Sequence, residues 1–281
     1  MSVERVERAG IAVEGISVAG IETCLHLPGF KVAVDLGCSL REVVSCPTVL
    51  FTHAHVDHLG AVVSHCATRA LQHMPPPTYV VPAPVAGNVR RLLDVWRDLD
   101  GSALPCTVVP LAPGEEHELG RGLVVRAFAT FHRSPSLGYA ILSRRQKLRP
   151  AYQGLPEAEL RRLRVEEGVE ISHAIETVEA AIPGDTLIDV VEREELVRTA
   201  RLLILETTFV DGRVTVAEAR GEGHIHLDEV VARAELFENE EILLVHFSAR
   251  YRPAEIRAAL RANLPEDLAG RVTAFLAGEG P

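Results

Sequence analysis

The sequence lacks the features of a membrane or secreted protein. No basic N-terminal segment is followed by an apolar run, so we expect no secretory signal. No stretch of about 18 residues is apolar and free of charges, which argues against a membrane-spanning helix. The five cysteines form no C-x-x-C pair, and an odd number of scattered thiols is typical of a reducing compartment. We therefore expect a cytoplasmic location without membrane contact.

A surplus of basic residues is also absent. Lysine and arginine number 29 against 39 aspartates and glutamates, so the formal net charge at pH 7 is −10. This charge opposes general affinity for nucleic acid, and an RNA-binding protein of this composition must concentrate positive charge locally. The segment Arg144–Arg149 is basic, and Arg161, Arg162 and Arg164 follow it. We expect a short basic insert at about 144–170; the alternative is an ordinary surface helix with a solvated basic face.

What the sequence does contain is the pattern of one large α/β domain. The 281 residues are 47% hydrophobic and 24% charged, an ordinary balance for a chain with a well-buried core. Apolar, β-branched runs alternate with helical segments, which favours layered sheets and helices in a single domain over residues 1–281. Strands are predicted at Ile11–Val18, Lys31–Asp35, Thr48–Thr52, Thr78–Val81, Thr107–Pro110, Leu123–Phe131, Tyr139–Ser143 and Leu202–Glu206. Helices are predicted at Ala61–His73, Ala86–Leu99, Pro156–Val165, Leu187–Arg198, Leu227–Phe237 and Pro253–Ala262.

The most informative segment is Thr52–His58, which follows a predicted buried strand. His53 and His55 alternate along the chain and point the same way if the strand continues. Asp57 and His58 follow in the turn and can face a second position. Imidazole and carboxylate side chains together suit a hydrolytic metal pair. Packing alone explains the cluster poorly, because burying such groups without partners costs several kcal/mol.

Three further candidate ligands stand at the ends of apolar, strand-like runs. They are His132, Asp185 and His246. Taken singly, either histidine also fits a core or surface position, and Gly184-Asp185 also fits an ordinary turn. Together with the first cluster, the three residues favour a metal centre assembled at one edge of a sheet.

This ligand set resembles that of the metallo-β-lactamase superfamily. Secondary motifs narrow the resemblance to the tRNA 3′-processing endonucleases, ribonuclease Z, and within them to the short form found in plants. The motifs are Pro135-Ser136-Leu137-Gly138-Tyr139, Gly184-Asp185-Thr186, Leu205-Glu206-Thr207-Thr208-Phe209, Gly223-His224 and His246-Phe247-Ser248-Ala249-Arg250-Tyr251. The third motif departs from the family's His-Glu-Ala-Thr-Phe at two positions. The correspondence runs from about Glu22 to Tyr251.

The resemblance implies an αββα sandwich of two mixed β-sheets flanked by helices. It also implies two metal ions, for which zinc is the default, with manganese or iron as alternatives that fit similar ligands. The implied ligands are His53, His55 and His132 for one metal, Asp57, His58 and His246 for the other, and Asp185 as the bridge.

The implied reaction is hydrolysis of a phosphodiester by an activated water, which Asp57 helps to orient. His224, held by Glu206, would protonate the departing ribose 3′ oxygen and leave a 3′-hydroxyl on the tRNA. His226 is a rival for the acid role. The residues expected to bind substrate are Ser248, Arg250, Arg161, Arg162 and Arg164.

The implied partners are precursor tRNA and a second copy of the chain in a homodimer. Many members of the family carry a protruding basic arm near residues 144–170, whereas we expect only a short insert here, without the long arm. Two other functions remain open at this point. One is a small-molecule metallo-hydrolase of the same superfamily, acting as a phosphodiesterase, thioesterase or lactonase. The other is a non-catalytic RNA-binding relative, which the intact ligand set argues against.

Overall fold

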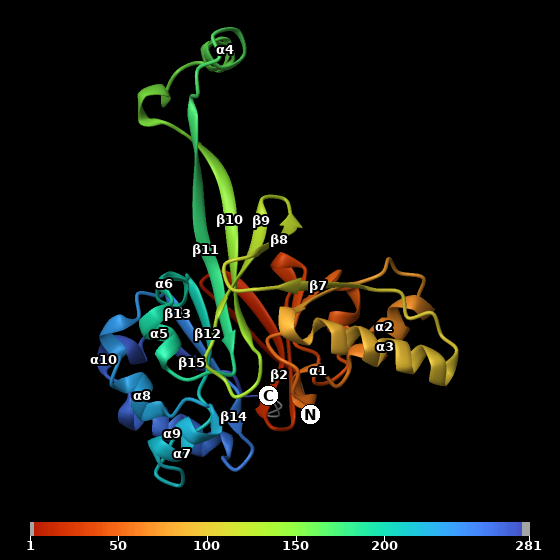
Figure 1. Ribbon diagram of the computed structural model, residues 1–281. Coiled ribbons are helices and arrows are strands. Elements are labelled where there is room, and N and C mark those ends of the chain that lie inside the picture. Colours follow the sequence, from red (N-terminus) through yellow and green to blue (C-terminus); the bar gives the residue numbers. More distant parts are fainter. Residues whose placement is uncertain (1–2, 277–281) are drawn as a thin grey trace.

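A computed structural model describes residues 3–276 as two β-sheets packed face to face, with helices on both outer faces (Figure 1). The first sheet has the strand order β1-β2-β3-β4-β5-β6-β7, with β14 beside β2, and the second has the order β15-β13-β12-β11-β10-β9-β8. Both sheets contain parallel and antiparallel pairs. The expected αββα sandwich of mixed sheets is confirmed.

The strands of the first sheet are β1 Glu4–Arg8, β2 Ile11–Ala19, β3 Glu22–Leu27, β4 Val32–Val34, β5 Thr48–Leu50, β6 Thr78–Pro82, β7 Thr107–Leu111 and β14 Phe247–Ser248. Those of the second are β8 Glu116–Gly120, β9 Leu123–Ala129, β10 Leu137–Leu148, β11 Ser172–Gly184, β12 Leu202–Glu206, β13 Glu241–Val245 and β15 Val272–Ala274. The predicted strands all lie within or overlap these. The sequence analysis missed β1, β3, β8, β14 and β15. Charged residues alternate along β1 and β8 and leave one face of each strand in solvent. The strands β14 and β15 have only two and three residues, too few for a periodic pattern.

Three apolar layers hold the sandwich together. Between the sheets, side chains such as Val13 and Leu50 pack against Tyr139 and Ile204 of the opposite sheet. A second layer joins the first sheet to its helices, and a third joins the second sheet to its own. The strand β13, between β15 and β12, is buried on both faces over Ile242–Val245, which explains its continuous apolar run.

The helices are α1 Val56–Leu59, α2 Val62–Leu71, α3 Ala86–Asp100, α4 Glu157–Arg161, α5 Asp189–Arg193, α6 Glu195–Thr199, α7 Val216–Glu222, α8 Leu227–Val231, α9 Pro253–Asn263 and α10 Glu266–Ala269. Two predicted helices are shorter than expected. The segment Leu187–Arg198 is broken at Glu194, whose extended backbone separates α5 from α6. The segment Leu227–Phe237 leaves the α conformation after Val231. Within the described residues, no helix is long and apolar enough to cross a membrane.

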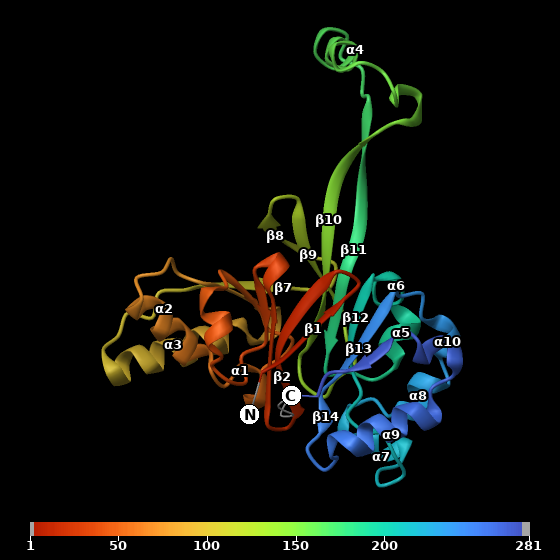
Figure 2. The ribbon, with the colours of Figure 1, turned by 180° about the vertical axis from the view of Figure 1, so that it is seen from behind.

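The strands β10 and β11 extend beyond the body as a two-stranded arm with a helical tip, which both views show (Figures 1 and 2). Their antiparallel pairing continues to Leu148 opposite Ser172. The tip contains α4 and a following turn of π-helix, Arg162–Glu166. The expectation of a short insert without an arm is therefore wrong. The apolar run of β10 ends at Ser143, and beyond that point no burial pattern marks the strand in the sequence.

Candidate metal centre

All seven predicted ligands meet at one edge of the sandwich. His53 and His55 lie in the loop after β5, and Asp57 and His58 lie on α1. His132, Asp185 and His246 follow β9, β11 and β13, respectively, so the opposite sheet delivers them from its strand ends. The structure shows the predicted convergence of these residues.

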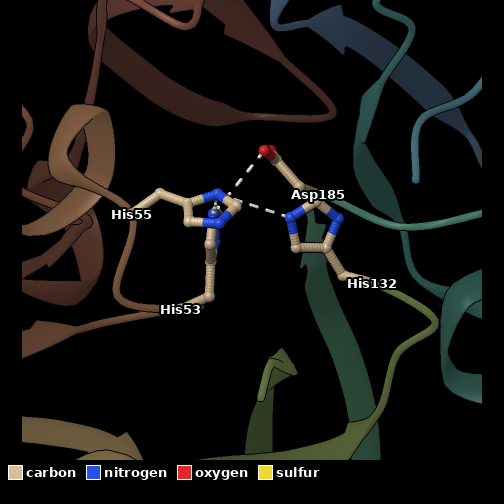
Figure 3. A group of neighbouring side chains, drawn as sticks. All are labelled: His53, His55, His132 and Asp185. Atoms are coloured by element: carbon tan, nitrogen blue, oxygen red, sulfur yellow. Dashed lines mark hydrogen bonds and ion pairs between the residues drawn. The ribbon is translucent and has the colours of Figure 1, made fainter. Parts of the chain in front are cut away.

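Four of these side chains form one group, drawn in Figure 3. His53 Nε2 lies 3.0 Å from His55 Nδ1, which in turn lies 3.5 Å from His132 Nε2. Asp185 Oδ2 lies 3.7 Å from His53 Nε2. Burial and the neighbouring His58 lower the pKa of His53 to about 2, so its ring is neutral and its lone pair can bind a cation.

A second group consists of Asp57, His58 and His246. His58 Nε2 lies 3.3 Å from His246 Nε2 and 3.7 Å from Asp57 Oδ2. Asp185 stands between the two groups, because its Oδ2 lies 3.4 Å from His58 Nε2 and its Oδ1 lies 3.4 Å from His246 Nε2. A carboxylate in this position can bridge two cations.

Contacts behind the rings determine which nitrogen faces inward. The outer Nδ1 atoms have oxygen partners at 2.8–3.1 Å: Thr52 Oγ1 for His53, Asp35 Oδ2 for His58, the Gly223 carbonyl for His132 and Thr208 Oγ1 for His246. Each of these rings therefore presents Nε2 to the centre, whereas His55 presents Nδ1. Oriented imidazoles around a buried carboxylate fit divalent cations, so the donor set matches the metals that the sequence implies.

Asp35 contacts the site, and the sequence analysis did not single it out. It is fully buried at the end of β4, and its carboxylate accepts hydrogen bonds from the backbone N–H and the hydroxyl of Thr52. The same carboxylate holds His58 Nδ1 at 2.8 Å. Its backbone is left-handed, with φ of 57°, an uncommon conformation for a residue other than glycine. An aspartate at the end of the predicted strand Lys31–Asp35 was the available signal.

Beside the metal groups, Glu206 and His224 form a pair. Glu206 is 1% exposed, and its Oε1 lies 3.0 Å from His224 Nδ1. The His224 ring stands 5.4 Å from the rings of both His132 and His246, measured between centroids. Burial alone would lower the pKa of His224, but the Glu206 carboxylate and its hydrogen bond raise it to about 9.

His226, the rival candidate for the acid, has a structural role. Its Nδ1 accepts a hydrogen bond from the backbone N–H of Asp228 at the start of α8. Its Nε2 lies 3.2 Å from the carbonyl oxygen of Asp211. Both ring nitrogens are thus engaged in holding a helix and a loop.

The structure separates the expected substrate-binding residues into two places. Ser248 and Arg250 lie two and four residues beyond His246, and the backbone N–H of Ser248 donates to the carbonyl oxygen of Thr208, whose side chain contacts His246. Arg250 Nε donates to Ser248 Oγ at 3.0 Å, and its guanidinium lies over the Phe209 ring. The three arginines of the insert, Arg161, Arg162 and Arg164, instead lie at the tip of the arm (Figure 1).

This fold and this cluster define a metal-binding domain of the β-lactamase superfamily. The family model "Beta-lactamase superfamily domain" matches residues 36–247. A Bacillus subtilis metallo-β-lactamase fold protein, YhfI, has a TM-score of 0.61 at 13% identity, with 94% of this chain and 95% of that chain covered. The human short-form tRNase Z has a TM-score of 0.58 at 19% identity, with 92% and 95% covered. At these identities the two structures establish the fold alone.

Sequence relatives identify the narrower family. The chain is 43% identical to an Arabidopsis thaliana protein named tRNase Z TRZ1 over 271 residues, which cover 96% of each sequence. The chain therefore belongs to the tRNase Z, or ribonuclease Z, family and is a hydrolase.

Proposed function

We propose that this hydrolase removes the 3′ trailer from precursor tRNA by hydrolysing one phosphodiester and leaving a 3′-hydroxyl on the tRNA. The observation that carries the proposal is the Glu206–His224 pair, which stands against the metal groups with 3.0 Å between carboxylate and ring. A ribose 3′ oxygen is a poor leaving group and needs a proton donor, whereas an activated leaving group such as a nitrophenolate needs none. The 43% identity to a plant tRNase Z supports the same substrate.

The metals would occupy the two groups described above. We assign His53, His55 and His132 to one cation, Asp57, His58 and His246 to the other, and Asp185 to both. Zinc suits this imidazole-rich set, and manganese or iron would fit similar ligands. When bound, the two cations supply an activated water and neutralise charge on the phosphate oxygens.

Asp57 would orient the attacking water. One of its carboxylate oxygens, Oδ2, accepts a hydrogen bond from the backbone N–H of Gly20 at 2.9 Å, which fixes the side chain at the mouth of the site. Burial would raise the pKa of Asp57, but His246 and His58 hold it well below its usual range. The carboxylate therefore stays ionised and can accept a hydrogen bond from water at neutral pH.

His224 would act as the general acid. Its Nδ1 is held by Glu206, which leaves Nε2 as the atom that can donate to the departing oxygen. The raised pKa keeps the ring protonated at neutral pH. Glu206 is a positioning residue, because it touches the histidine and not the reacting atoms.

The arm would hold the body of the tRNA away from the metal centre. Arg161 and Arg164 are exposed at its tip, and neither forms an ion pair with another described residue. Arg162 is partly neutralised, with Nε 3.3 Å from Glu167 Oε1. Contacts from such side chains to phosphates give affinity without reading the base sequence, which suits an enzyme that acts on many tRNAs.

A second copy of the chain would dock on α3. This helix exposes Leu92, Val95, Trp96 and Leu99 on one face, with Trp96 43% and Leu99 71% exposed. Packing two copies antiparallel about a two-fold axis near Val95 would bring Leu92 of each copy close to Leu99 of the other. Trp96→Asp should convert the dimer to monomer in sedimentation, whereas Leu71→Asp on α2 should not.

The cytoplasmic location expected from the sequence stays a prediction.

Incubation with a 3′-extended tRNA transcript tests the proposed function. The purified, metal-containing protein should make a single cut and leave a 3′-hydroxyl, and a chelator should stop the reaction until metal is restored. Cleavage of a nitrophenyl phosphodiester, but of no tRNA transcript, would instead support the small-molecule alternative.

A further inference from the structure

A cavity of about 470 Å³ lies at the base of the arm, apart from the metal centre. Its walls come from both sheets and include Phe30, Arg121, Ser143, Arg145 and Glu179. Glu179 lies on β11, and Asp185, six residues later, directly follows that strand. This spacing places the cavity about 20 Å from the metal groups along the strand. The volume is in the range of small-molecule sites.

The cavity contains two kinds of arginine. Arg144 and Arg201 are held by carboxylates, since Arg144 Nε lies 2.9 Å from Glu176 Oε2 and Arg201 Nη1 lies 2.9 Å from Glu179 Oε2. Arg121 and Arg145 are exposed and form no ion pair or hydrogen bond with another side chain that the structure describes. Arg145 is near enough to Glu179 to help lower the pKa of that carboxyl, but Ser143 and Arg201 hold the two Glu179 oxygens. The N–H donors of Arg121 and Arg145 are thus available to an anion.

The remaining walls add shape and an aromatic surface. Phe30 and Ile11 contribute apolar surface to the lining, which also includes Glu7. Arg121 adopts a left-handed backbone with φ of 56°, between Gly120 and Gly122, whose φ values are also positive. This tight turn holds Arg121 against the cavity in a conformation that is uncommon for a residue with a side chain.

We propose that this cavity binds a nucleoside 5′-phosphate. A phosphomonoester carries about −1.5 to −2 charges near pH 7, which the two unpaired guanidiniums match. Guanidinium groups bind phosphate oxygens through paired N–H donors. The base would lie on Phe30, because nucleobases stack on aromatic rings without regard to sequence. The same chemistry is offered by a free mononucleotide and by a terminal nucleotide of RNA, and we assign the free mononucleotide.

Calorimetric titration of the full-length, metal-loaded protein with 5′-AMP tests this site. The protein should bind AMP more tightly than either inorganic phosphate or adenosine alone. Replacing Arg121 and Arg145 together with alanine should weaken AMP binding by about tenfold or more. The matched control is Arg41→Ala with Arg261→Ala, which removes the same charge elsewhere on the surface and should leave AMP binding unchanged. If AMP instead bound at the metal groups, both double variants would bind it as tightly as the unaltered protein.

A second titration distinguishes the two sources of the nucleotide. For a free mononucleotide site, the Arg121/Arg145 double variant keeps its affinity for mature tRNA while losing AMP. A loss of tRNA affinity with no AMP binding to the unaltered protein would overturn the assignment of a free ligand. Equal AMP affinity in the unaltered protein and the Arg121/Arg145 double variant would overturn the site itself. Inorganic phosphate that binds as tightly as AMP would overturn the proposed stacking of the base on Phe30.

Discussion

The strands β10 and β11 serve two regions that differ in almost every physical respect. At one end they lead into the metal centre, where β10 is buried from Leu137 to Ser143 and β11 ends beside Asp185. At the other end they form the arm, where Arg145 and its neighbours are exposed. The same hairpin is thus part of the buried core at its base and an exposed, two-stranded arm at its tip (Figure 2).

Different forces hold the two ends. At the metal end, apolar packing and backing hydrogen bonds fix the ligands, as the Asp35–His58 contact of 2.8 Å shows. In the arm, the two strands are held together by backbone hydrogen bonds and by cross-strand ion pairs such as Arg144–Glu176. An isolated two-stranded hairpin of this kind is only marginally stable. Changes at the metal end should therefore affect every substrate, whereas changes in the arm should affect only large ones.

The largest effect is expected from Asp185→Ala. The change removes the carboxylate between the two metal groups, so both cations lose a ligand and their mutual repulsion is less screened. Turnover of tRNA and of a nitrophenyl phosphodiester should fall together by about 10³-fold or more, which corresponds to about 4 kcal/mol in the barrier. Elemental analysis should show the accompanying loss of metal, and the exposed Asp267→Ala should change neither. Full metal content with lost activity would contradict the bridging role.

Next in size is the effect of removing the proton donor. His224→Ala should slow tRNA cleavage by about 10²-fold or more, keep both metals and spare the nitrophenyl ester, whose leaving group needs little protonation. In the unaltered protein, the rate should fall as the pH rises through the raised pKa of His224, and the variant should lose this alkaline limb. A metal lost from His224→Ala would show that the ring is a ligand.

Glu206 sharpens that comparison, because it does more than hold His224. Its carboxylate also accepts hydrogen bonds from the backbone N–H groups of Thr186 and Thr208 and from the Thr208 hydroxyl. Glu206→Ala should thus lower the free energy of unfolding by about 3–5 kcal/mol, as for a broken buried pair, while His224→Ala should cost far less. Chemical denaturation of the metal-loaded proteins measures both.

A smaller effect is expected from Gly223→Ala. Gly223 has φ of 86°, and a Cβ there would lie 2.9 Å from His132 Nδ1. The histidine must shift, so metal affinity should fall by about 10- to 100-fold. Gly221→Ala is the matched control, because a Cβ at that position meets nothing within 4 Å. Competition with a chromogenic chelator reports the affinity, and unchanged affinity in Gly223→Ala would show that His132 is not a ligand.

The smallest effect is expected at the tip of the arm. Replacing Arg161 and Arg164 with serine should weaken tRNA binding by about tenfold. It should also make the slope of log affinity against log salt concentration less steep by about two. Arg162→Ser should do less, because Glu159 and Glu167 already partly neutralise that side chain. Filter binding over a range of salt concentrations gives both values. An equal effect of Arg162→Ser would show that its ion pairs open on binding RNA.

The two regions also differ in how far the sequence predicts them. Predicted metal ligands such as His53 and His246 stand at the ends of apolar runs, so their meeting at one edge follows from the order of strands and turns. Asp35 was missed because its position at a strand end is only a weak signal by itself, and its role depends on the contact with His58, which the fold alone creates. The arm was missed because exposed strands have no apolar alternation, and only the pairing of Leu148 with Ser172 reveals them.

The most direct test compares two substrates on a protein without its arm. Residues 147–173 can be replaced by Asn-Gly, because Gln146 and Ala174 face each other in the ladder and a two-residue turn can join them. The account predicts that kcat/KM for a 3′-extended tRNA falls by about 10²-fold or more, while turnover of a nitrophenyl phosphodiester changes by less than about twofold. Equal losses on both substrates, or no loss on either, would contradict the division between a buried centre that performs the chemistry and an arm that holds the RNA.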